Sequence, residues 1–229
     1  MSNYNKILVK FPSRSRPEKF FATLDNYIQL AEHDDYVILC SLDLDDATMN
    51  NPEVKARLAF YPKVIPVWGK GTGSKTEAIN RDMNTVKDWD ILILLSDDQQ
   101  IIVRGFDLLI IDLFKKYFTG RKGALHTFDG TVNERQITTS ILNKELYDWF
   151  GFIYNPVYIS VYTDTEFKAI VEMIGAYHME PIVLFRHCHP AWGLAPNDSL
   201  YQRNEHKDIY RDDCMTYNER RKRNFDLVL

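Results

Sequence analysis

The chain has 229 residues, of which 45% are hydrophobic and 26% are charged. This composition is that of an ordinary globular protein, and it excludes disordered, collagen-like and coiled-coil chains. The length allows one large α/β domain or two small ones, with a sizeable buried core. Because 28 Lys and Arg face 32 Asp and Glu, the formal net charge of −4 provides no overall attraction to nucleic acid or to anionic lipid.

Neither a membrane span nor a cysteine framework is predicted. No apolar run approaches the roughly 18 to 20 residues that cross a bilayer, and the amino terminus does not resemble a signal peptide. Cys40, Cys188 and Cys214 are widely spaced and form no CxxC pair, so neither a disulfide framework nor a cysteine zinc site is indicated. We expect a cytoplasmic protein, and for a virus-encoded chain this means the host cytoplasm.

The first half of the chain alternates apolar runs with helical patterns. Strands are predicted over residues 6–11, 36–41, 64–68 and 90–95. Helices are predicted after the first and third strands, and their starts carry the capping boxes Ser15–Glu18 and Ser74–Glu77. Continuous apolar strands that alternate with helices are typical of a mainly parallel sheet with both faces covered. Such sheets bind ligands at the carboxyl ends of their strands.

The second half has shorter and more mixed elements. The pattern predicts helices over residues 105–118 and 165–177, a further helix that ends at Gly151, and strands over 137–142 and 181–189. The tail from Asp198 is charged and aromatic, and we expect it to be helical in pieces. Because no repeat or flexible linker is found, residues 1–229 are predicted to form a single domain with two functional halves.

Two adjacent carboxylates, Asp97 and Asp98, follow a predicted buried strand. They are held close together at the sheet edge and repel each other unless a cation joins them. Carboxylate oxygens suit Mg²⁺ or Mn²⁺, with water and a substrate diphosphate as the remaining ligands. The alternative is that one of the two caps a turn after the strand.

A glycine-rich segment, Gly69–Lys75, lies between a predicted strand and a predicted helix. Backbone N–H groups and a lysine at such a place can bind a phosphate. The segment is not a P-loop, because Ser74 stands where that motif requires a glycine. A flexible loop before a capped helix explains the glycines equally well. It explains less well why Lys75, Asn80 and Arg81 lie together in one helix.

Two further sets of residues could carry chemistry in the second half. His187 and His189 are two apart on a predicted strand, so both point to one face, as metal ligation or phosphate contact requires. They could equally bond to neighbouring carboxylates. Asp164 and Glu166 stand at a predicted helix start, where a capping box with Thr163 would explain both. The functional alternative is a general base.

The order of these motifs resembles that of the GT-A glycosyltransferases, most closely family 2 in the short versions common in bacteria and their viruses. The resemblance lies in the opening strand with the Pro12–Pro17 loop, the acidic end of the second strand, the Lys75-x4-Asn80-Arg81 helix and the Ser96-Asp97-Asp98 turn. It covers about the first 110 residues well and the rest more loosely. It implies a GT-A-like α/β fold with a Rossmann-like nucleotide half, about residues 1–115, and a smaller mixed acceptor half, about residues 116–229.

The resemblance also implies that the protein binds a nucleoside-diphosphate sugar, with a UDP-sugar as the favoured donor. The residues that would bind it are Pro12, Ser13, Arg14, Arg16, Asp43, Asp45, Lys75, Asn80, Arg81 and Asp97. Asp43 or Asp45 would accept a hydrogen bond from the base. Asp98 would bind Mn²⁺ or Mg²⁺, and His187 or His189 would complete the coordination.

The implied reaction is a metal-dependent hexosyl transfer to an acceptor hydroxyl, with inversion. In the family, the catalytic base lies at a helix start in a motif of the form Glu-Asp-x-acidic-apolar. Thr163–Phe167 is similar, with Thr in place of the Glu. Asp164 is therefore the implied base, with Glu166 as the second choice.

Three other functions stay open from the sequence. A phosphotransferase would use residues 69–76 as a degenerate phosphate loop. A nucleotidyltransferase of similar sheet architecture would consume a sugar phosphate and release pyrophosphate. A non-catalytic nucleotide- or sugar-binding module would keep binding but have no turnover.

The acceptor is not determined by the sequence. A glycan, a protein, a small molecule and a modified DNA base are all compatible with it, whereas the lack of a membrane-associating helix disfavours a lipid. The basic run Arg220–Arg223 would serve DNA, although such runs are usually solvated faces. Aromatic residues that could stack on sugars or bases are Trp149, Tyr154, Tyr158, Tyr162 and Trp192.

Overall fold

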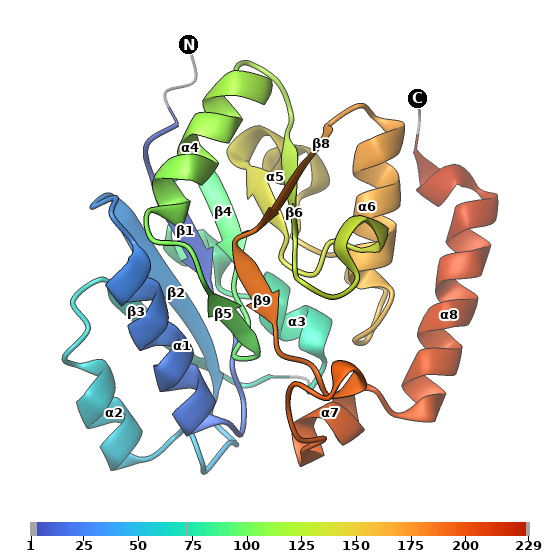
Figure 1. Cartoon of the computed structure of the whole chain (residues 1–229). Helices are drawn as coiled ribbons and strands as arrows, with labels where there is room; N and C mark the ends of the chain where they lie inside the picture. The colour runs from blue at the N-terminus through green and yellow to red at the C-terminus, as the bar shows by residue number, and fades with distance from the viewer. Residues whose placement is uncertain (1–3, 72, 228–229) are drawn as a thin grey trace.

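The computed structural model describes residues 4–71 and 73–227, and its centre is a seven-stranded sheet (Figure 1). The strand order is β3–β2–β1–β4–β7–β6–β8. These strands are β1 (Ile7–Lys10), β2 (Tyr36–Asp43), β3 (Val64–Gly69), β4 (Ile91–Leu94), β6 (Ala124–Phe128), β7 (Ile141–Asn143) and β8 (Tyr177–Val183). Only β7 runs antiparallel to its neighbours, so the mainly parallel sheet is confirmed. A separate antiparallel pair joins β5 (Gln99–Ile101) to β9 (Phe185–His187).

Helices cover both faces of the sheet, which is why the central strands β1 and β4 bury apolar side chains on both faces. One face packs against α1 (Pro17–Leu30), α2 (Pro52–Leu58) and α4 (Phe106–Tyr117). The other face packs against α3 (Lys75–Asn80), α5 (Lys144–Phe150) and α6 (Thr163–Met173). Alternate side chains of each strand serve the two faces: in β1, Ile7 and Val9 join the first cluster and Leu8 joins the second.

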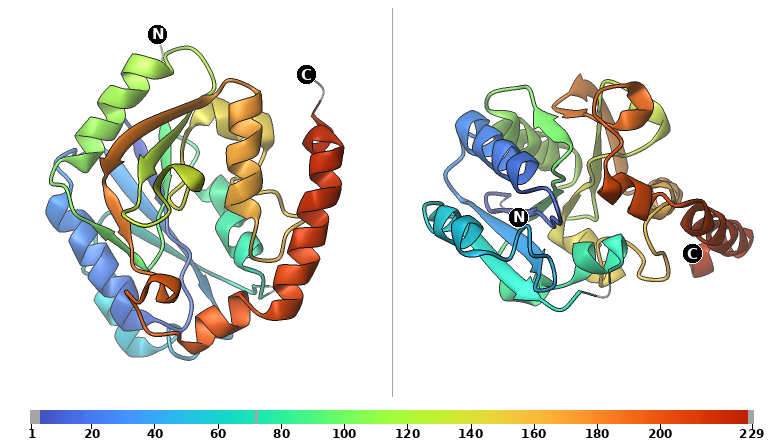
Figure 2. Two further views of the ribbon diagram at one scale, coloured as in Figure 1. Left: turned by 45° about the vertical axis from the view of Figure 1, so that its right-hand side comes forward. Right: turned by 90° about the horizontal axis from the view of Figure 1, so that it is seen from below.

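The tail is helical in two pieces, as predicted. These are α7 (Ser199–Asn204) and α8 (Lys207–Lys222), and α8 runs along the side of the molecule next to α6 (Figure 2). Within α8 only Asp213 is buried, and Arg220 reaches Glu166 of α6 at 2.8 Å. Among the helices of the described residues, none has the length and apolar character needed to cross a membrane.

Two of the predicted capping boxes are wrong. The first helix begins at Pro17 with Arg16 at its N-cap, and Ser15 makes no cap. Proline favours the first helical position, and the residue before it avoids helical dihedral angles, so the helix cannot begin earlier. Thr163 lies inside α6, whose N-cap is Tyr162. The third box is confirmed in part, since the Ser74 side chain accepts from the backbone N–H of Glu77.

Four predicted boundaries in the second half also differ. α6 ends at Met173 rather than at Tyr177, because Gly175 adopts a left-handed φ of 68° that stops the helix. The chain then enters β8 at Tyr177, earlier than predicted, and Pro181 is tolerated because β8 is an edge strand. The strand expected over 137–142 pairs only over Ile141–Asn143. The last predicted strand ends at His187, which leaves His189 outside it.

Candidate functional site

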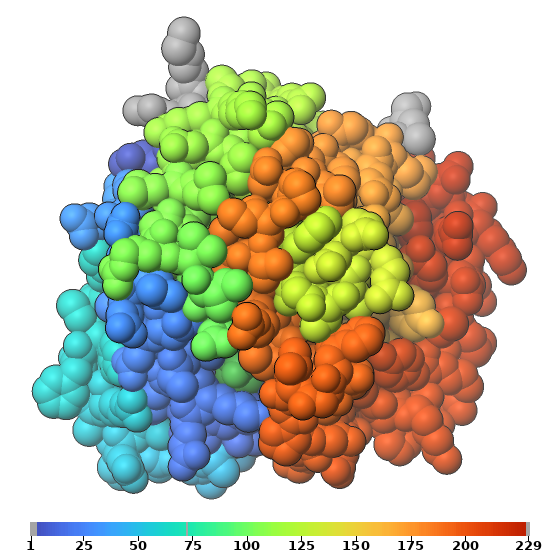
Figure 3. Space-filling model, viewed as in Figure 1, coloured from blue at the N-terminus to red at the C-terminus, as the bar shows by residue number. Residues whose placement is uncertain are grey.

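A cavity of about 470 Å³ opens at the carboxyl ends of β1, β2 and β4. This is the place where α/β sheets bind ligands. Its other walls come from the start of α3, from residues 160–165 and from the segment 187–205. That segment, drawn in orange, lies on the molecular surface between the first half of the chain and α8 (Figure 3). Residues from both halves therefore enclose one cavity.

The two carboxylates after β4 have different surroundings. Asp97 accepts from Arg16 Nη1 at 2.8 Å and from Ser13 Oγ at 2.9 Å, so both of its oxygens are paired with the loop after β1. Burial and the neighbouring Asp98 raise the pKa of Asp97. Asp98 instead accepts from the Tyr201 hydroxyl at 2.9 Å, and its Oδ2 lies 3.6 Å from His187 Nε2.

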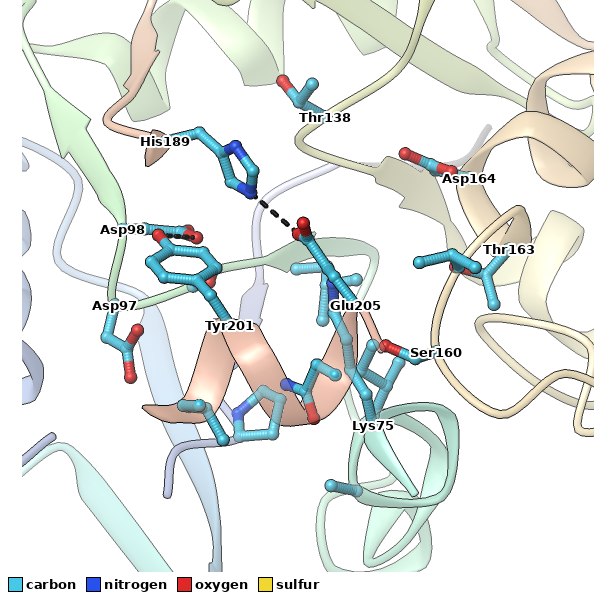
Figure 4. A pocket seen from close by; sticks show the side chains of 18 of the residues that line it. Lys75, Asp97, Asp98, Thr138, Ser160, Thr163, Asp164, His189, Tyr201 and Glu205 are labelled. Atoms are coloured by element: carbon cyan, nitrogen blue, oxygen red, sulfur yellow. Dashed lines mark hydrogen bonds and ion pairs between the residues drawn. The ribbon is translucent and has the colours of Figure 1, made fainter. Parts of the chain in front are cut away.

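Asp98 is held as a carboxylate despite being buried. Burial alone would raise its pKa, but His187, Ser96 and the positive charge of Lys75 together hold the pKa well below its usual range. An ionised oxygen beside a histidine nitrogen is a suitable pair of ligands for a divalent ion. Figure 4 shows Asp98 on one side of the cavity, next to Tyr201.

This arrangement offers two protein ligands for a metal ion, Asp98 and His187. Within the described residues there is no group of three or more His, Cys, Asp or Glu side chains arranged to hold a metal ion. Mg²⁺ and similar ions are usually bound by one or two protein ligands plus substrate phosphates and water. Asp98 and His187 fit that requirement. His189 does not join them, because its Nε2 pairs with Glu205 at 2.8 Å and its Nδ1 accepts from the backbone N–H of Ala191 at 3.2 Å.

The residues predicted to bind the nucleotide sugar divide into two groups. Pro12, Ser13, Arg14, Arg16, Asp43, Lys75 and Asp97 line the cavity, whereas Asp45, Asn80 and Arg81 do not. Asn80 has a structural contact, since its amide oxygen accepts from the backbone N–H of Ile153 at 2.9 Å. Thr72, in the predicted phosphate loop, lies outside the described residues.

Asp43 is the centre of an ion-pair network at the end of β2. One of its oxygens accepts from Arg14 and the other from Arg81, each at 2.7 Å. Arg14 also pairs with the exposed Asp45 at 2.7 Å. A nucleobase that forms a hydrogen bond to Asp43 must therefore share this carboxylate with one of the two guanidinium groups, or displace that group.

Lys75 is a cation in the cavity without a close partner among the described residues. It extends from the start of α3 (Figure 4), and within the described part of the chain it makes no hydrogen bond or close ion pair. Its charge nevertheless lowers the pKa of Asp98 and of Glu205. An unpaired ammonium group beside a carboxylate pair is suited to an anionic ligand.

The two acids of α6 face different ways. Asp164 lines the cavity on the side opposite Asp98, and its Oδ2 accepts from Gln136 Nε2 at 2.5 Å (Figure 4). Glu166 is 2% exposed and lies outside the cavity lining. Its oxygens accept from the Tyr158 hydroxyl at 2.5 Å and from Arg220 at 2.8 Å. Glu166 therefore joins α6 to α8, and Asp164 is the acid that a substrate could reach.

The basic run is partly structural. Arg220 pairs with Glu166 and Asp226, and Arg223 also pairs with Asp226.

Of the aromatic candidates, Tyr154 and Tyr158 are buried, and Trp149 lies outside the cavity lining. Only Tyr154, Tyr162 and Trp192 of that set contribute to its walls.

Gln136, Tyr201 and Glu205 are among the polar residues of the cavity that sequence reasoning missed. Tyr201 lies under the Arg16 guanidinium at 4.0 Å and bonds to Asp98. The signal that could have found it is Asp198, which caps α7 and pairs with Arg16 at 2.6 Å. An N-cap aspartate before a short helix is visible in the sequence, but its partner is not.

Neither a protein-family model nor a curated protein sequence matches this chain. Solved structures do. The mannosyltransferase PcManGT from Pyrobaculum calidifontis, in complex with GDP-Man and Mn²⁺, superposes with a TM-score of 0.63 at 15% identity, over 82% of this chain and 60% of that chain. S. aureus TarS, in complex with UDP, has a TM-score of 0.61 at 9% identity, over 79% of this chain and 60% of that chain.

A CMP:2-keto-3-deoxy-manno-octonic acid synthetase complexed with CTP has a TM-score of 0.50 at 13% identity, over 79% of this chain and 91% of that chain. The present chain spans 60% of the length of the mannosyltransferase chain and of the TarS fragment 1–349, and 36% of the longer TarS chain. At these identities the likeness concerns the fold. The chain has a GT-A-like fold.

Proposed function

We propose that this protein is a divalent-metal-dependent glycosyltransferase that moves a sugar from a nucleoside-diphosphate sugar to an acceptor hydroxyl. The observation that carries the proposal is the arrangement of three charged groups in one cavity at the strand ends. Asp98 with His187 lies on one side, Asp164 on the other, and Lys75 between them (Figure 4). The GT-A-like fold and neighbours in complex with GDP-Man, UDP and UDP-GlcNAc support it.

Each group has a defined task in the proposed reaction. Asp164 takes the proton of the acceptor hydroxyl, whose oxygen bonds to the anomeric carbon while the carbon–oxygen bond to the diphosphate breaks. The electron pair of that bond leaves with the nucleoside diphosphate, and Lys75 attracts the resulting negative charge. A metal ion bound by Asp98 and His187 would neutralise further charge on the diphosphate. Attack from the side opposite the leaving group inverts the anomeric carbon.

Gln136 orients the proposed base. Its amide nitrogen donates to one oxygen of Asp164, while the other oxygen accepts from the backbone N–H of Thr165 at 2.8 Å. These two hydrogen bonds fix the orientation of the Asp164 carboxylate at the cavity wall. A base must be within hydrogen-bond reach of its proton, and a carboxylate with fixed orientation meets that requirement best.

A thermal-shift experiment tests the proposal. Because a ligand that binds only the folded state raises the melting temperature, UDP or GDP at about 100 times its Kd adds about 2.7 kcal/mol, or roughly 5 to 10 °C for a chain of this size. We expect this shift only with Mn²⁺, and we expect Asp98→Asn to remove it. Asp112→Asn, on the exposed face of α4, is the matched control. No shift with any nucleoside diphosphate, or the same shift in Asp98→Asn, would contradict the proposal.

A nucleotidyltransferase is the second candidate, favoured by the likeness to a synthetase complexed with CTP. The two reactions differ in their released product. A glycosyltransferase releases a nucleoside diphosphate, whereas a nucleotidyltransferase consumes a nucleoside triphosphate and releases pyrophosphate. Stabilisation by CTP or another triphosphate, followed by pyrophosphate release with a sugar phosphate, would select the second candidate.

A further inference from the structure

Three aromatic side chains line the cavity, and two of them, Tyr162 and Tyr210, are near the proposed base. They are Tyr162, Tyr210 and Trp192, here called the aromatic wall. Tyr210 is 45% exposed and Trp192 is 46% exposed, so each has an open face. Tyr162 contacts Tyr210 with ring centroids 6.3 Å apart and ring planes at 78°. Aromatic rings that stay open beside a polar cavity offer flat amphipathic surfaces to a ligand.

Tyr162 is placed beside the base by a strained backbone. It has a φ of 62°, it is the N-cap of α6, and it stands two residues before Asp164. A bulky residue in the left-handed region costs roughly 1 to 3 kcal/mol and persists only where the surroundings hold it. Here the preceding loop is held by Asp213, whose carboxylate accepts from the backbone N–H groups of residues 159–161 at 2.8 to 2.9 Å.

Tyr210 lies within electrostatic range of the base. Burial, Glu205 and Asp164 raise its pKa, in that order. Glu205 and Asp164, the two carboxylates that raise this pKa, both line the cavity beside Tyr210. An acceptor that reaches Asp164 must pass these negative charges, which favours a neutral acceptor over a phosphorylated one.

A buried hydroxyl of the same loop has no partner. Ser160 is 3% exposed, lines the cavity, and its Oγ makes no hydrogen bond among the described residues. Its backbone N–H is already taken by Asp213 at 2.8 Å. A buried polar atom without a partner costs stability, so such atoms in a ligand cavity point to a polar group of the ligand.

We propose that the aromatic wall and Ser160 form the acceptor subsite, and that the acceptor is a neutral saccharide. This inference rests on the proposed function. A pyranose ring has an apolar C–H face, which fits an aromatic ring, and hydroxyl groups at its edge, which fit Ser160 and Asp164. A lipid chain would leave Ser160 unpartnered, and a phosphate-bearing nucleotide would meet Glu205 and Asp164.

The test is direct binding, which does not depend on turnover. Saturation-transfer NMR is recorded with neutral oligosaccharides of glucose, galactose, mannose and N-acetylglucosamine, and with glucose 6-phosphate. Each probe is used with and without UDP or GDP and Mn²⁺. We expect at least one neutral oligosaccharide to bind through its ring C–H protons and glucose 6-phosphate to bind more weakly.

The variants separate stacking from folding. Tyr210→Ala and Trp192→Ala should each weaken binding about tenfold, the loss expected for one stacked ring, and Tyr210→Phe should keep it. Trp149→Ala is the matched control, because Trp149 is 43% exposed but outside the cavity lining. Ser160→Ala should weaken binding without lowering the melting temperature.

Two results would overturn the inference. One is that no neutral oligosaccharide binds under either condition. The other is that binding is the same in Tyr210→Ala and Trp192→Ala as in Trp149→Ala. If the nucleoside-diphosphate shift persists in either case, only the acceptor subsite fails and the proposed function stands. If saccharides bind but no nucleotide does, the proposed function fails and the saccharide subsite stands.

Discussion

Replacing Asp213 by Asn tests how α8 supports the cavity wall. Asp213 is 2% exposed, and its oxygens accept from the N–H groups of Ile159, Ser160 and Val161 at 2.9, 2.8 and 2.9 Å. Oδ2 accepts two of these bonds and Oδ1 the third. Asn keeps one acceptor oxygen and places an NH₂ group against the remaining N–H. At least one buried donor therefore loses its partner.

The magnitude follows from these bonds. A buried unsatisfied donor costs about 1 to 3 kcal/mol, and bonds to a charged acceptor are worth more than bonds to a neutral one. A loss of about 3 kcal/mol in the free energy of unfolding is expected, which lowers the melting temperature by about 6 to 12 °C for a chain of this length. Because Asp164 follows this loop, the acceptor KM should also rise, while the nucleoside-diphosphate shift persists.

Asp212→Asn is the matched control for this substitution. Asp212 is the adjacent residue of the same helix, and its side chain is 53% exposed. Among the described residues its only ion pair is with the exposed Arg211 at 2.9 Å. The change in net charge is the same, yet exposed pairs contribute little. Thermal unfolding of both variants decides the matter: equal melting temperatures would refute the reasoning that Asp213 holds the wall.

Three further outcomes are expected. Asp164→Asn should lower the rate of nucleoside-diphosphate release on transfer at least about 100-fold with the nucleotide-induced melting shift intact, and near-normal turnover would place the base elsewhere. Burial opposes ionisation of Asp198, but hydrogen bonds from Arg16 and Lys19 hold its pKa below the usual range. Its stabilisation is therefore present above about pH 5 and lost as pH falls below about 4, so urea titrations of wild type and Asp198→Asn should converge in acid. Burial lowers the pKa of Lys10 to about 8. Between about pH 8 and 10.5 the Lys10 amine is therefore protonated in the unfolded chain but neutral in the folded one. The stability of wild type relative to Lys10→Met should rise there by about 3 kcal/mol, and a flat difference would contradict this.

The regular elements were predictable where local sequence decides them. α4 was expected over residues 105–118 and spans Phe106–Tyr117, because its apolar spacing and the preceding glycine act within one element. The errors arose where a non-local or backbone effect prevailed. Gly175 ended α6 early, and Pro17 moved the start of α1, since dihedral preferences of single residues override a matching side-chain pattern.

The candidate site was predictable only where it follows strands in the chain. Asp97 and Asp98 follow β4 and Arg16 ends the loop between β1 and α1, and parallel strands bring their carboxyl ends to one edge. The roles of the paired acids were not predictable. Asp97 is paired with Arg16 from the loop after β1, whereas Asp98 faces His187, which the folded chain brings to the cavity at the end of β9.

The sequence by itself determined the class of sheet and the half of the cavity built from the ends of β1, β2 and β4. The spacing of apolar residues and the order of strands and helices along the chain are enough to predict both. The tertiary structure alone decided that His189 pairs with Glu205, that Glu166 serves α8 and that Tyr201 reaches Asp98. These pairs join residues 16 to 103 positions apart in the chain. Only the path of the folded chain brings such residues within hydrogen-bond distance.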